Sequence, residues 1–202
     1  MGEMIKMYIK NYMDNSLRKN QFIFAGRLDK TKGIDKLMKG WKMLCDNDRN
    51  APVLLVCGTG PEKEWCQSFV ESNSLEKNIK MLGFVDNKEV IQHISKSKAL
   101  ILPTQWYEGF PVSIVEAYGY GTPVLGSAIG NVGSLVVDGI TGYIFDQKYP
   151  ESIMLAVQKV MESDDKKVNL YKSTFEYYNQ HYTTTENYKN LLDIYEAISN
   201  SK

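Results

Sequence analysis

Six short apolar runs alternate with amphipathic segments, and this pattern constrains the fold more than any other feature of the sequence. The runs, which predict strands, span residues 22–25, 53–57, 79–82, 99–102 and 124–125, with a short sixth at 143–145. Strands that alternate with helices form a parallel sheet covered on both faces. We therefore predict an α/β fold with a Rossmann-like, doubly wound parallel sheet, whose ligands bind beyond the carboxyl ends of the strands.

Helical periodicity supports this prediction. In the first helical segment one apolar stripe recurs at i, i+3, i+4, i+7 and i+10, formed by Ile34, Leu37, Met38, Trp41 and Leu44. After about residue 150 the strands stop and a helical C-terminal tail follows. We expect residues 1–20 to be a tail or the remnant of an interdomain linker, and residues 21–202 to form one domain.

Two glycines and two cations lie in the turn that enters the first helix. Gly26 and Gly33 let the backbone approach a ligand closely, and a helix start offers unpaired N–H groups. Arg27 can bind phosphate oxygens through two hydrogen bonds, with Lys32 as a point charge beside it. The segment suits a diphosphate, while by itself it fits a solvated basic loop about equally well.

A second glycine-rich turn, Gly58-Thr59-Gly60, follows the second predicted strand. A dinucleotide fingerprint would need a further glycine at position 63, where the chain has Lys63. The sequence also lacks a Walker-type phosphate loop. These departures disfavour a nicotinamide or flavin cofactor and an ordinary NTPase.

Two glutamates separated by seven residues follow the fourth predicted strand. Glu108 lies in the loop at the ligand end of the sheet, and Glu116 about one and a half turns into a helix that begins near Pro111. Carboxylates accept hydrogen bonds from the hydroxyls of a sugar or ribose, and the N–H groups of Gly109 and Phe110 can meet an anion. The alternative is a helix cap and a solvated helix acid.

Composition excludes several other classes of protein. The 24 basic and 24 acidic side chains balance, so no strong field recruits nucleic acid. No apolar run approaches the roughly 18 residues of a membrane span, and no signal peptide is visible, so we expect a cytoplasmic location. The three cysteines and two histidines lack metal-like spacing, which predicts reduced, structural thiols and no metal site.

Taken together, these motifs resemble the large family of retaining GT-B glycosyltransferases numbered family 4, over about residues 21–200. The matching pieces, in family order, are Gly26-Arg27-Leu28 with Lys32-Gly33, Gly58-x-Gly60, Gly83-Phe84-Val85, Glu108-Gly109-Phe110 with Glu116-Ala117, and Gly121-Thr122-Pro123-Val124. The chain departs from the family at Gly133-Ser134, where a Pro-Glu pair is usual. The resemblance implies the C-terminal, donor-binding half of a GT-B fold, with an acceptor-binding N-terminal domain outside this sequence against which the terminal helix would pack.

The resemblance also implies a role for each motif. Arg27 and Lys32 would bind the diphosphate of a nucleotide sugar, UDP- or GDP-linked, and stabilise it as it departs. Glu116 would bind the ribose hydroxyls, Glu108 the donor sugar or the loop presenting it, and the backbone of residues 83–85 would lie against the nucleobase. No cofactor is expected besides this donor substrate.

The implied activity is transfer of a hexose-like sugar, with retention of configuration, to a glycan or lipid-linked acceptor, as in polysaccharide biosynthesis. The chain alone would bind donor weakly and transfer poorly, and peripheral membrane contact of the full enzyme is compatible with the sequence. Alternatives are a noncatalytic nucleotide-sugar-binding module, since a fold alone does not establish activity, a sugar-nucleotide epimerase, and a phosphorylase. The joint presence of Arg27, Lys32, Glu108 and Glu116 argues against the noncatalytic module.

Overall fold

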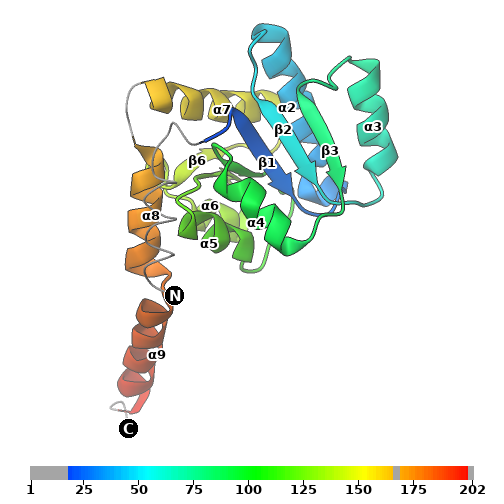
Figure 1. The fold of residues 1–202 in the computed structure, drawn as a ribbon. Helices are drawn as coiled ribbons and strands as arrows, with labels where there is room; N and C mark the ends of the chain where they lie inside the picture. The colour runs from blue at the N-terminus through cyan, green and yellow to red at the C-terminus, as the bar shows by residue number, and fades with distance from the viewer. Residues whose placement is uncertain (1–17, 166–168, 200–202) are drawn as a thin grey trace.

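The computed structural model describes residues 18–165 and 169–199, and its centre is a six-stranded parallel sheet in the order β3-β2-β1-β4-β5-β6 (Figure 1). The strands are β1 (Gln21–Ala25), β2 (Val53–Cys57), β3 (Ile79–Gly83), β4 (Leu100–Leu102), β5 (Val124–Ser127) and β6 (Gly142–Phe145). Neighbouring strands pair in parallel throughout. All six predicted strands are confirmed, with their ends shifted by at most two residues.

The strand order reverses between β1 and β4. From β1 the chain builds outward to β2 and β3, then returns to place β4 on the other side of β1 and builds outward again to β6. The connections that leave β1 and β4 therefore run in opposite directions, and a crevice opens at their carboxyl ends. This confirms the predicted Rossmann-like, doubly wound architecture.

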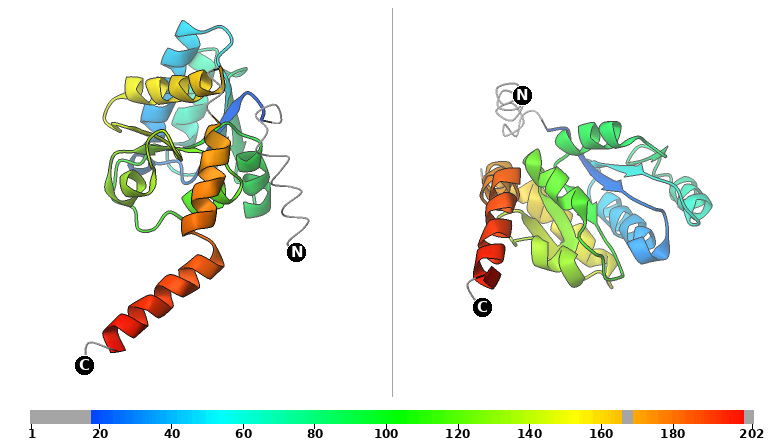
Figure 2. Two further views of the ribbon diagram at one scale, coloured as in Figure 1. Left: turned by 90° about the vertical axis from the view of Figure 1, so that its left-hand side faces the viewer. Right: turned by 90° about the horizontal axis from the view of Figure 1, so that it is seen from below.

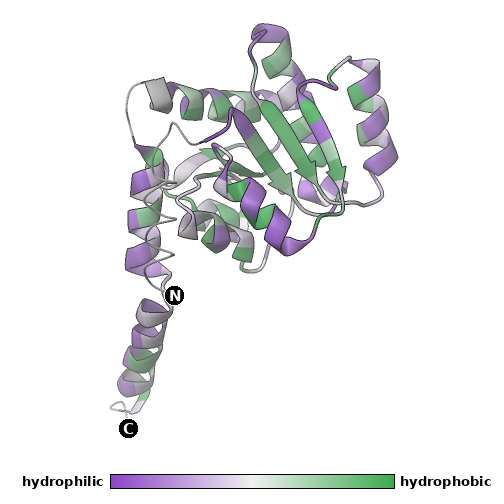
Figure 3. Cartoon of the chain, viewed as in Figure 1, coloured by the Kyte–Doolittle hydropathy of each residue, from purple (hydrophilic) through white to green (hydrophobic). Residues whose placement is uncertain are grey.

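Helices cover both faces of the sheet. They are a short 3-10 helix, η2 (Lys30–Lys32), followed by α2 (Ile34–Asn47), α3 (Lys63–Ser72), α4 (Asn87–Ser95), α5 (Val112–Gly119), α6 (Gly130–Leu135), α7 (Pro150–Asp165), α8 (Leu170–His181) and α9 (Thr184–Ser199). One face carries α2, α3 and α7, while α4, α5 and α6 pack on the other (Figure 2). The strands are the apolar centre of this arrangement (Figure 3).

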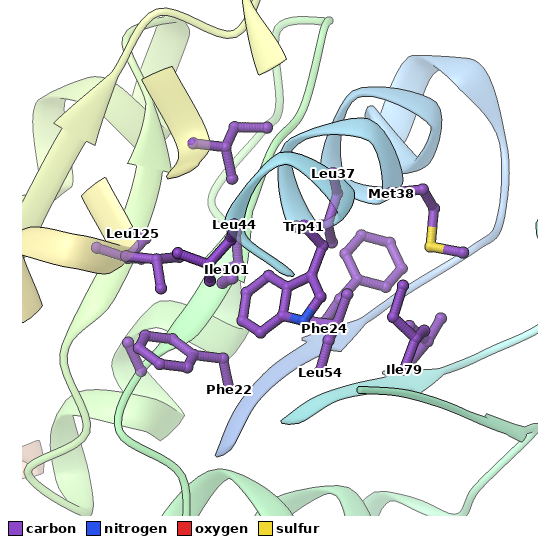
Figure 4. Packing of buried hydrophobic residues seen from close by; sticks show 14 of the residues in the cluster. Phe22, Phe24, Leu37, Met38, Trp41, Leu44, Leu54, Ile79, Ile101 and Leu125 are labelled. Carbon is purple, nitrogen blue, oxygen red and sulfur yellow. The ribbon is translucent and has the colours of Figure 1, made fainter. Parts of the chain in front are cut away.

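Alternate residues of the strands pack into two separate hydrophobic cores, one on each face of the sheet. Phe22 and Phe24 point toward α2 and α7, whereas Ile23 packs against the α4–α5 side. Trp41 of α2 meets the Phe22 ring edge-on, with the ring centroids 5.6 Å apart (Figure 4). The whole predicted stripe of α2 is buried, and each such large side chain contributes about 1.5–3 kcal/mol to folding. This packing holds the carboxyl ends of the strands in place.

The folded domain includes Arg18, three residues before the predicted start at residue 21. Its side chain is 7% exposed. Arg18 Nη1 donates to the Ser97 carbonyl at 3.0 Å and to the Thr122 hydroxyl at 2.6 Å, and Nη2 donates to the Tyr120 carbonyl at 2.8 Å. The rest of the predicted tail, residues 1–17, lies outside the described residues.

The predicted helical C-terminal tail is present as α7, α8 and α9. Tyr177 of α8 packs edge-on against Tyr118 of α5, with the ring centroids 6.4 Å apart. Beyond it, α9 extends away from the sheet (Figures 1 and 2). Its exposed apolar side chains are Tyr188, Leu191, Leu192, Ile194, Tyr195 and Ile198. Within the described ranges, no helix combines the length and hydrophobicity that a membrane crossing requires.

Candidate functional site

Two cavities open side by side at the carboxyl edge of the sheet, where the strand order reverses. Cavity 1, of about 220 Å³, lies between the ends of β1 and β4, and its walls include Lys32 and Glu108. Cavity 2, of about 280 Å³, lies at the ends of β1, β2 and β3, and its walls include Arg27. Ala25 and Gly26 line both cavities. The two cavities are therefore neighbours, one on each side of the end of β1, and we refer to them together as the crevice.

An ion pair between Lys32 and Glu108 lies in the wall of cavity 1. The Lys32 ammonium donates to Glu108 Oε1 at 2.5 Å, and the two side chains are 37% and 24% exposed. Because solvent still reaches both groups, the pair contributes little to stability. Oε1 also accepts a hydrogen bond from the buried Thr104 hydroxyl at 3.0 Å. Cavity 1 thus presents a cation and a carboxylate in one fixed arrangement.

Asp29 organises the loop that carries Arg27 and Lys32. Its carboxylate accepts a hydrogen bond from the Lys32 N–H at 3.0 Å, which caps η2, and it lies 3.1 Å from Arg27 Nε. The hydrogen bond from the Thr31 hydroxyl, helped by those from the backbone, holds the pKa of Asp29 below its ordinary value. The Arg27 side chain remains 66% exposed. The two predicted phosphate-binding cations therefore border adjacent cavities.

The glycines after β1 and β2 allow the loops to pack against each other. The Gly58 N–H donates to the Gly83 carbonyl at 2.6 Å. A Cβ on Gly58, whose φ is 138°, would lie 1.9 Å from the Gly26 carbonyl oxygen, and one on Gly60 would lie 2.4 Å from the carbonyl oxygen of Leu28. Close loop packing thus accounts for Gly58 and Gly60, the two glycines of the second glycine-rich turn.

Cavity 2 has mostly apolar walls. Phe84 and Val85, which follow β3, contribute to them together with Cys57 and Val90. Phe84 is 83% exposed, which is unusual for so large an apolar side chain. Burial raises the pKa of the Cys57 thiol to about 11. Two of the three residues predicted to meet a nucleobase, Phe84 and Val85, therefore line an apolar cavity.

The loop that contains Glu108 and Gly109 is held by α6. Asn131 donates through Nδ2 to the Glu108 carbonyl at 3.2 Å and to the Gly109 carbonyl at 2.9 Å. Phe110, the next residue of the predicted motif, is 57% exposed. Pro111 is the N-cap of α5, so this helix begins one residue later, at Val112.

Glu116 lies apart from both cavities. As the fifth residue of α5 it stands just over one turn into the helix, slightly less than predicted. Its carboxylate lies 3.5 Å from Asn87 Nδ2, at the start of α4, in an exposed contact. Glu116 lines neither cavity 1 nor cavity 2. The structure thus brings Lys32 and Glu108 together and leaves Glu116 beside the crevice, between α4 and α5.

Sequence reasoning did not identify Thr104 and Asn131, which hold the Glu108 loop. Thr104 gave a weak signal in the sequence, because it is a polar residue two positions after the end of a predicted strand. Asn131 gave no signal in the sequence, because its hydrogen-bond partners are backbone carbonyls of another segment. Two large aromatic residues beside Glu108 were also not identified: Trp106 is 68% exposed and Tyr107 is 73% exposed.

Comparisons with known proteins show which family the chain resembles. The family model described as Glycosyl transferases group 1 matches residues 10–177. An uncharacterised 41.2 kDa protein in the cps region of Klebsiella pneumoniae is 30% identical over 139 residues, which are 67% of this chain and 36% of that protein.

Solved structures show the same fold. A TarM variant of S. aureus, in complex with fondaparinux, alpha-GlcNAc-glycerol and UDP, superposes with a TM-score of 0.76 at 20% identity, over 89% of this chain and 36% of that one. HepE of Anabaena, in complex with UDP, superposes with a TM-score of 0.75 at 17% identity, over 98% of this chain and 53% of that one.

The chain spans between about a third and a half of the length of the curated relatives it matches. The family model covers most of the chain, and the doubly wound sheet carries the Lys32–Glu108 pair at its strand reversal. The chain therefore belongs to the family of glycosyl transferases group 1.

Proposed function

We propose that this chain is the donor-binding domain of a retaining glycosyltransferase, which transfers a hexose-like sugar from a UDP- or GDP-linked donor to a glycan or lipid-linked acceptor. One observation carries the proposal. At the strand reversal an apolar cavity lies next to a charged one, with Arg27 in the wall of the first and Lys32 in the wall of the second. A nucleotide sugar has the same sequence of parts, namely an apolar base, an anionic diphosphate and a polar sugar.

In this proposal the nucleobase occupies cavity 2, against Phe84 and Val85. The diphosphate lies across the end of β1, where Gly26 lines both cavities, within reach of Arg27 and Lys32. Arginine binds phosphate through two hydrogen bonds and lysine as a point charge. The donor sugar then enters cavity 1 beside Glu108.

Glu116 is assigned to the ribose hydroxyls. The nucleotide's ribose joins base to diphosphate, so it must lie near the junction of the two cavities. Glu116 stands beside the crevice, and within the described part of the chain its carboxylate accepts one hydrogen bond, from Asn87 at the long distance of 3.5 Å. A carboxylate so weakly bonded can accept hydrogen bonds from two adjacent hydroxyls.

In this proposal the chain contributes to catalysis mainly through electrostatic stabilisation. Sugar transfer develops negative charge on the departing diphosphate, and preorganised donors aimed at that charge lower the barrier. Arg27 and Lys32 supply such donors. Removing one preorganised donor typically costs about 2.7–4 kcal/mol of barrier, so Arg27→Ala should lower transfer by roughly 10²–10³-fold in the complete enzyme.

The neighbours support the donor class and suggest the setting. TarM and HepE were both solved with UDP, and the Klebsiella relative is encoded in a cps region. We place the acceptor on a second domain of a longer protein, because the matched relatives are about twice as long as this chain. The exposed apolar side chains of α9 would then pack against that domain.

The test is a calorimetric titration of the chain with UDP, GDP and ADP, repeated with Arg27→Ala and Glu116→Ala. Arg49→Ala, which removes a cation at an exposed position away from the crevice, is the matched control. Selective binding of one nucleotide, weakened about tenfold or more by the first two substitutions and unchanged by the third, is expected. Binding that is indifferent to Arg27 and Glu116 would remove the assignment.

A further inference from the structure

We infer that Thr104 is a positioning residue, which fixes the Glu108 carboxylate through one oxygen so that the other oxygen is presented to a sugar hydroxyl. The inference rests on the proposed function and names an additional residue for the same site. It starts from the position of Thr104, which lies two residues after the end of β4, lines cavity 1 and is only 3% exposed. A buried hydroxyl in a cavity wall needs a partner, and its choice of partner shapes the site.

The Thr104 hydroxyl has three acceptors within reach and one proton to donate. Glu108 Oε1 lies at 3.0 Å, the Trp106 carbonyl at 3.1 Å and the Thr31 carbonyl at 3.2 Å. A hydrogen bond to an ionised carboxylate is about twice as strong as one to a neutral carbonyl. The proton therefore points to Glu108, which is also the nearest of the three acceptors.

The two oxygens of Glu108 are used unequally. Oε1 accepts from both the Lys32 ammonium and the Thr104 hydroxyl. Oε2 accepts no hydrogen bond from any residue that the structure describes. When a carboxylate is held through one oxygen, its second oxygen points in a fixed direction and remains free to accept a hydrogen bond. In the proposed ligand, a sugar hydroxyl is the donor that would meet this oxygen.

The backbone on both sides of Glu108 is fixed as well. The Gln105 N–H donates to the Thr31 carbonyl at 2.7 Å, which joins the Glu108 loop to the segment that carries Lys32. Beyond Glu108, Asn131 holds the Gly109 carbonyl. With the main chain fixed, the torsions of the Glu108 side chain are the remaining freedom, and the Thr104 hydroxyl restricts them. This is the preorganisation that a specific polar contact requires.

The experiment compares Thr104→Val, which removes the hydroxyl at nearly constant shape, with Thr104→Ser, which keeps it. Thr185→Val, at an exposed position on α9, is the matched control for the chemical change. Each protein is titrated with UDP-glucose, UDP-N-acetylglucosamine and GDP-mannose, and with UDP and GDP alone. The readout is the ratio of affinities for the sugar nucleotide and its own nucleoside diphosphate, taken for the best-bound donor.

Thr104→Val should lower this ratio about tenfold while the affinity for the nucleoside diphosphate stays within about twofold. Thr104→Ser and Thr185→Val should keep the wild-type ratio. An unchanged ratio in Thr104→Val, with diphosphate binding intact, overturns the inference and leaves the proposed function standing. An equal loss in Thr104→Ser overturns it too, because the hydroxyl would not be the cause. If the wild-type chain binds none of these ligands, the proposed function fails and the inference fails with it.

Discussion

A Cβ atom on Gly33 would lie 1.8 Å from the carbonyl oxygen of Pro103, so these two backbones are closer than any side chain at position 33 would allow. Gly33 links η2 to α2, and Pro103 follows β4. Lys32 precedes the first residue and Thr104 follows the second. The close approach therefore sets the distance between the two loops that supply the Lys32–Glu108 pair.

Gly33→Ala should destabilise the domain by about 3 kcal/mol or more. A left-handed backbone, here with φ at 70°, costs a non-glycine residue about 1–2 kcal/mol, and displacement of the Pro103 carbonyl adds to this cost. Urea unfolding measures the loss. Gly139→Ala is the matched control, because Gly139 has φ at 75° and nothing within 4 Å of its Cβ position. Equal losses in the two variants would show that the Gly33–Pro103 approach is not a constraint.

The fold was predictable because its signals are local. Apolar runs bounded by turn residues placed the strands, and the stripe from Ile34 to Leu44 placed the face of α2. The site was predictable in part, since Lys32 and Glu108 each follow a strand that ends at the same edge of a parallel sheet. Their contact, across 76 positions of sequence, is observed.

What could not be predicted depends on partners distant in sequence. Thr104 meets Glu108 in a loop that is held in place by the hydrogen bond from the Gln105 N–H to the distant Thr31 carbonyl. Glu116 lines neither cavity because of how α5 packs beside α4, which no motif spacing records. Neither relation leaves a periodic trace in the chain.

Arg18 is the sharpest case, because a charged residue in a polar segment gives no sign that it is buried. Arg18→Met should destabilise the domain by about 2–4 kcal/mol, since it leaves the Ser97 and Tyr120 carbonyls without this donor. Methionine keeps much of the length and apolar surface of the side chain. Chemical unfolding measures the change in the free energy of unfolding. Arg49→Met is the control, because it removes a charge without removing these contacts, and its free energy of unfolding should stay within about 0.5 kcal/mol of wild type. A stability equal to that of the control would exclude Arg18 from the folded domain.

The labelling rates of the Cys57 and Cys66 thiols can be used to test both their burial and the position of the nucleotide site. Burial is the main cause that raises the pKa of Cys57 to about 11 and that of Cys66 to about 12, from an ordinary 9.0. Only the thiolate reacts, so the native chain should label slowly with iodoacetamide near pH 8 and faster as the pH rises toward 11, whereas the unfolded chain should level off near 9. Because the pKa of each thiol is higher in the folded chain than in the unfolded chain, the protonated thiols stabilise the fold below pH 9.0. This stabilisation is lost as the pH rises through the pKa of the folded state.

The two thiols should also respond differently to ligand. Cys57 lines cavity 2, whereas Cys66 packs in the core under α2. A nucleotide in cavity 2 should therefore protect Cys57 from labelling at about pH 9. The labelling rate of Cys57 should fall roughly in proportion to the fraction of chains with bound nucleotide, while the rate of Cys66 stays unchanged. Mass spectrometry of the labelled peptides, with and without saturating UDP or GDP, measures both rates in one sample. Equal protection of both thiols would indicate general stabilisation by the ligand, and protection of neither would place the nucleotide elsewhere than in cavity 2.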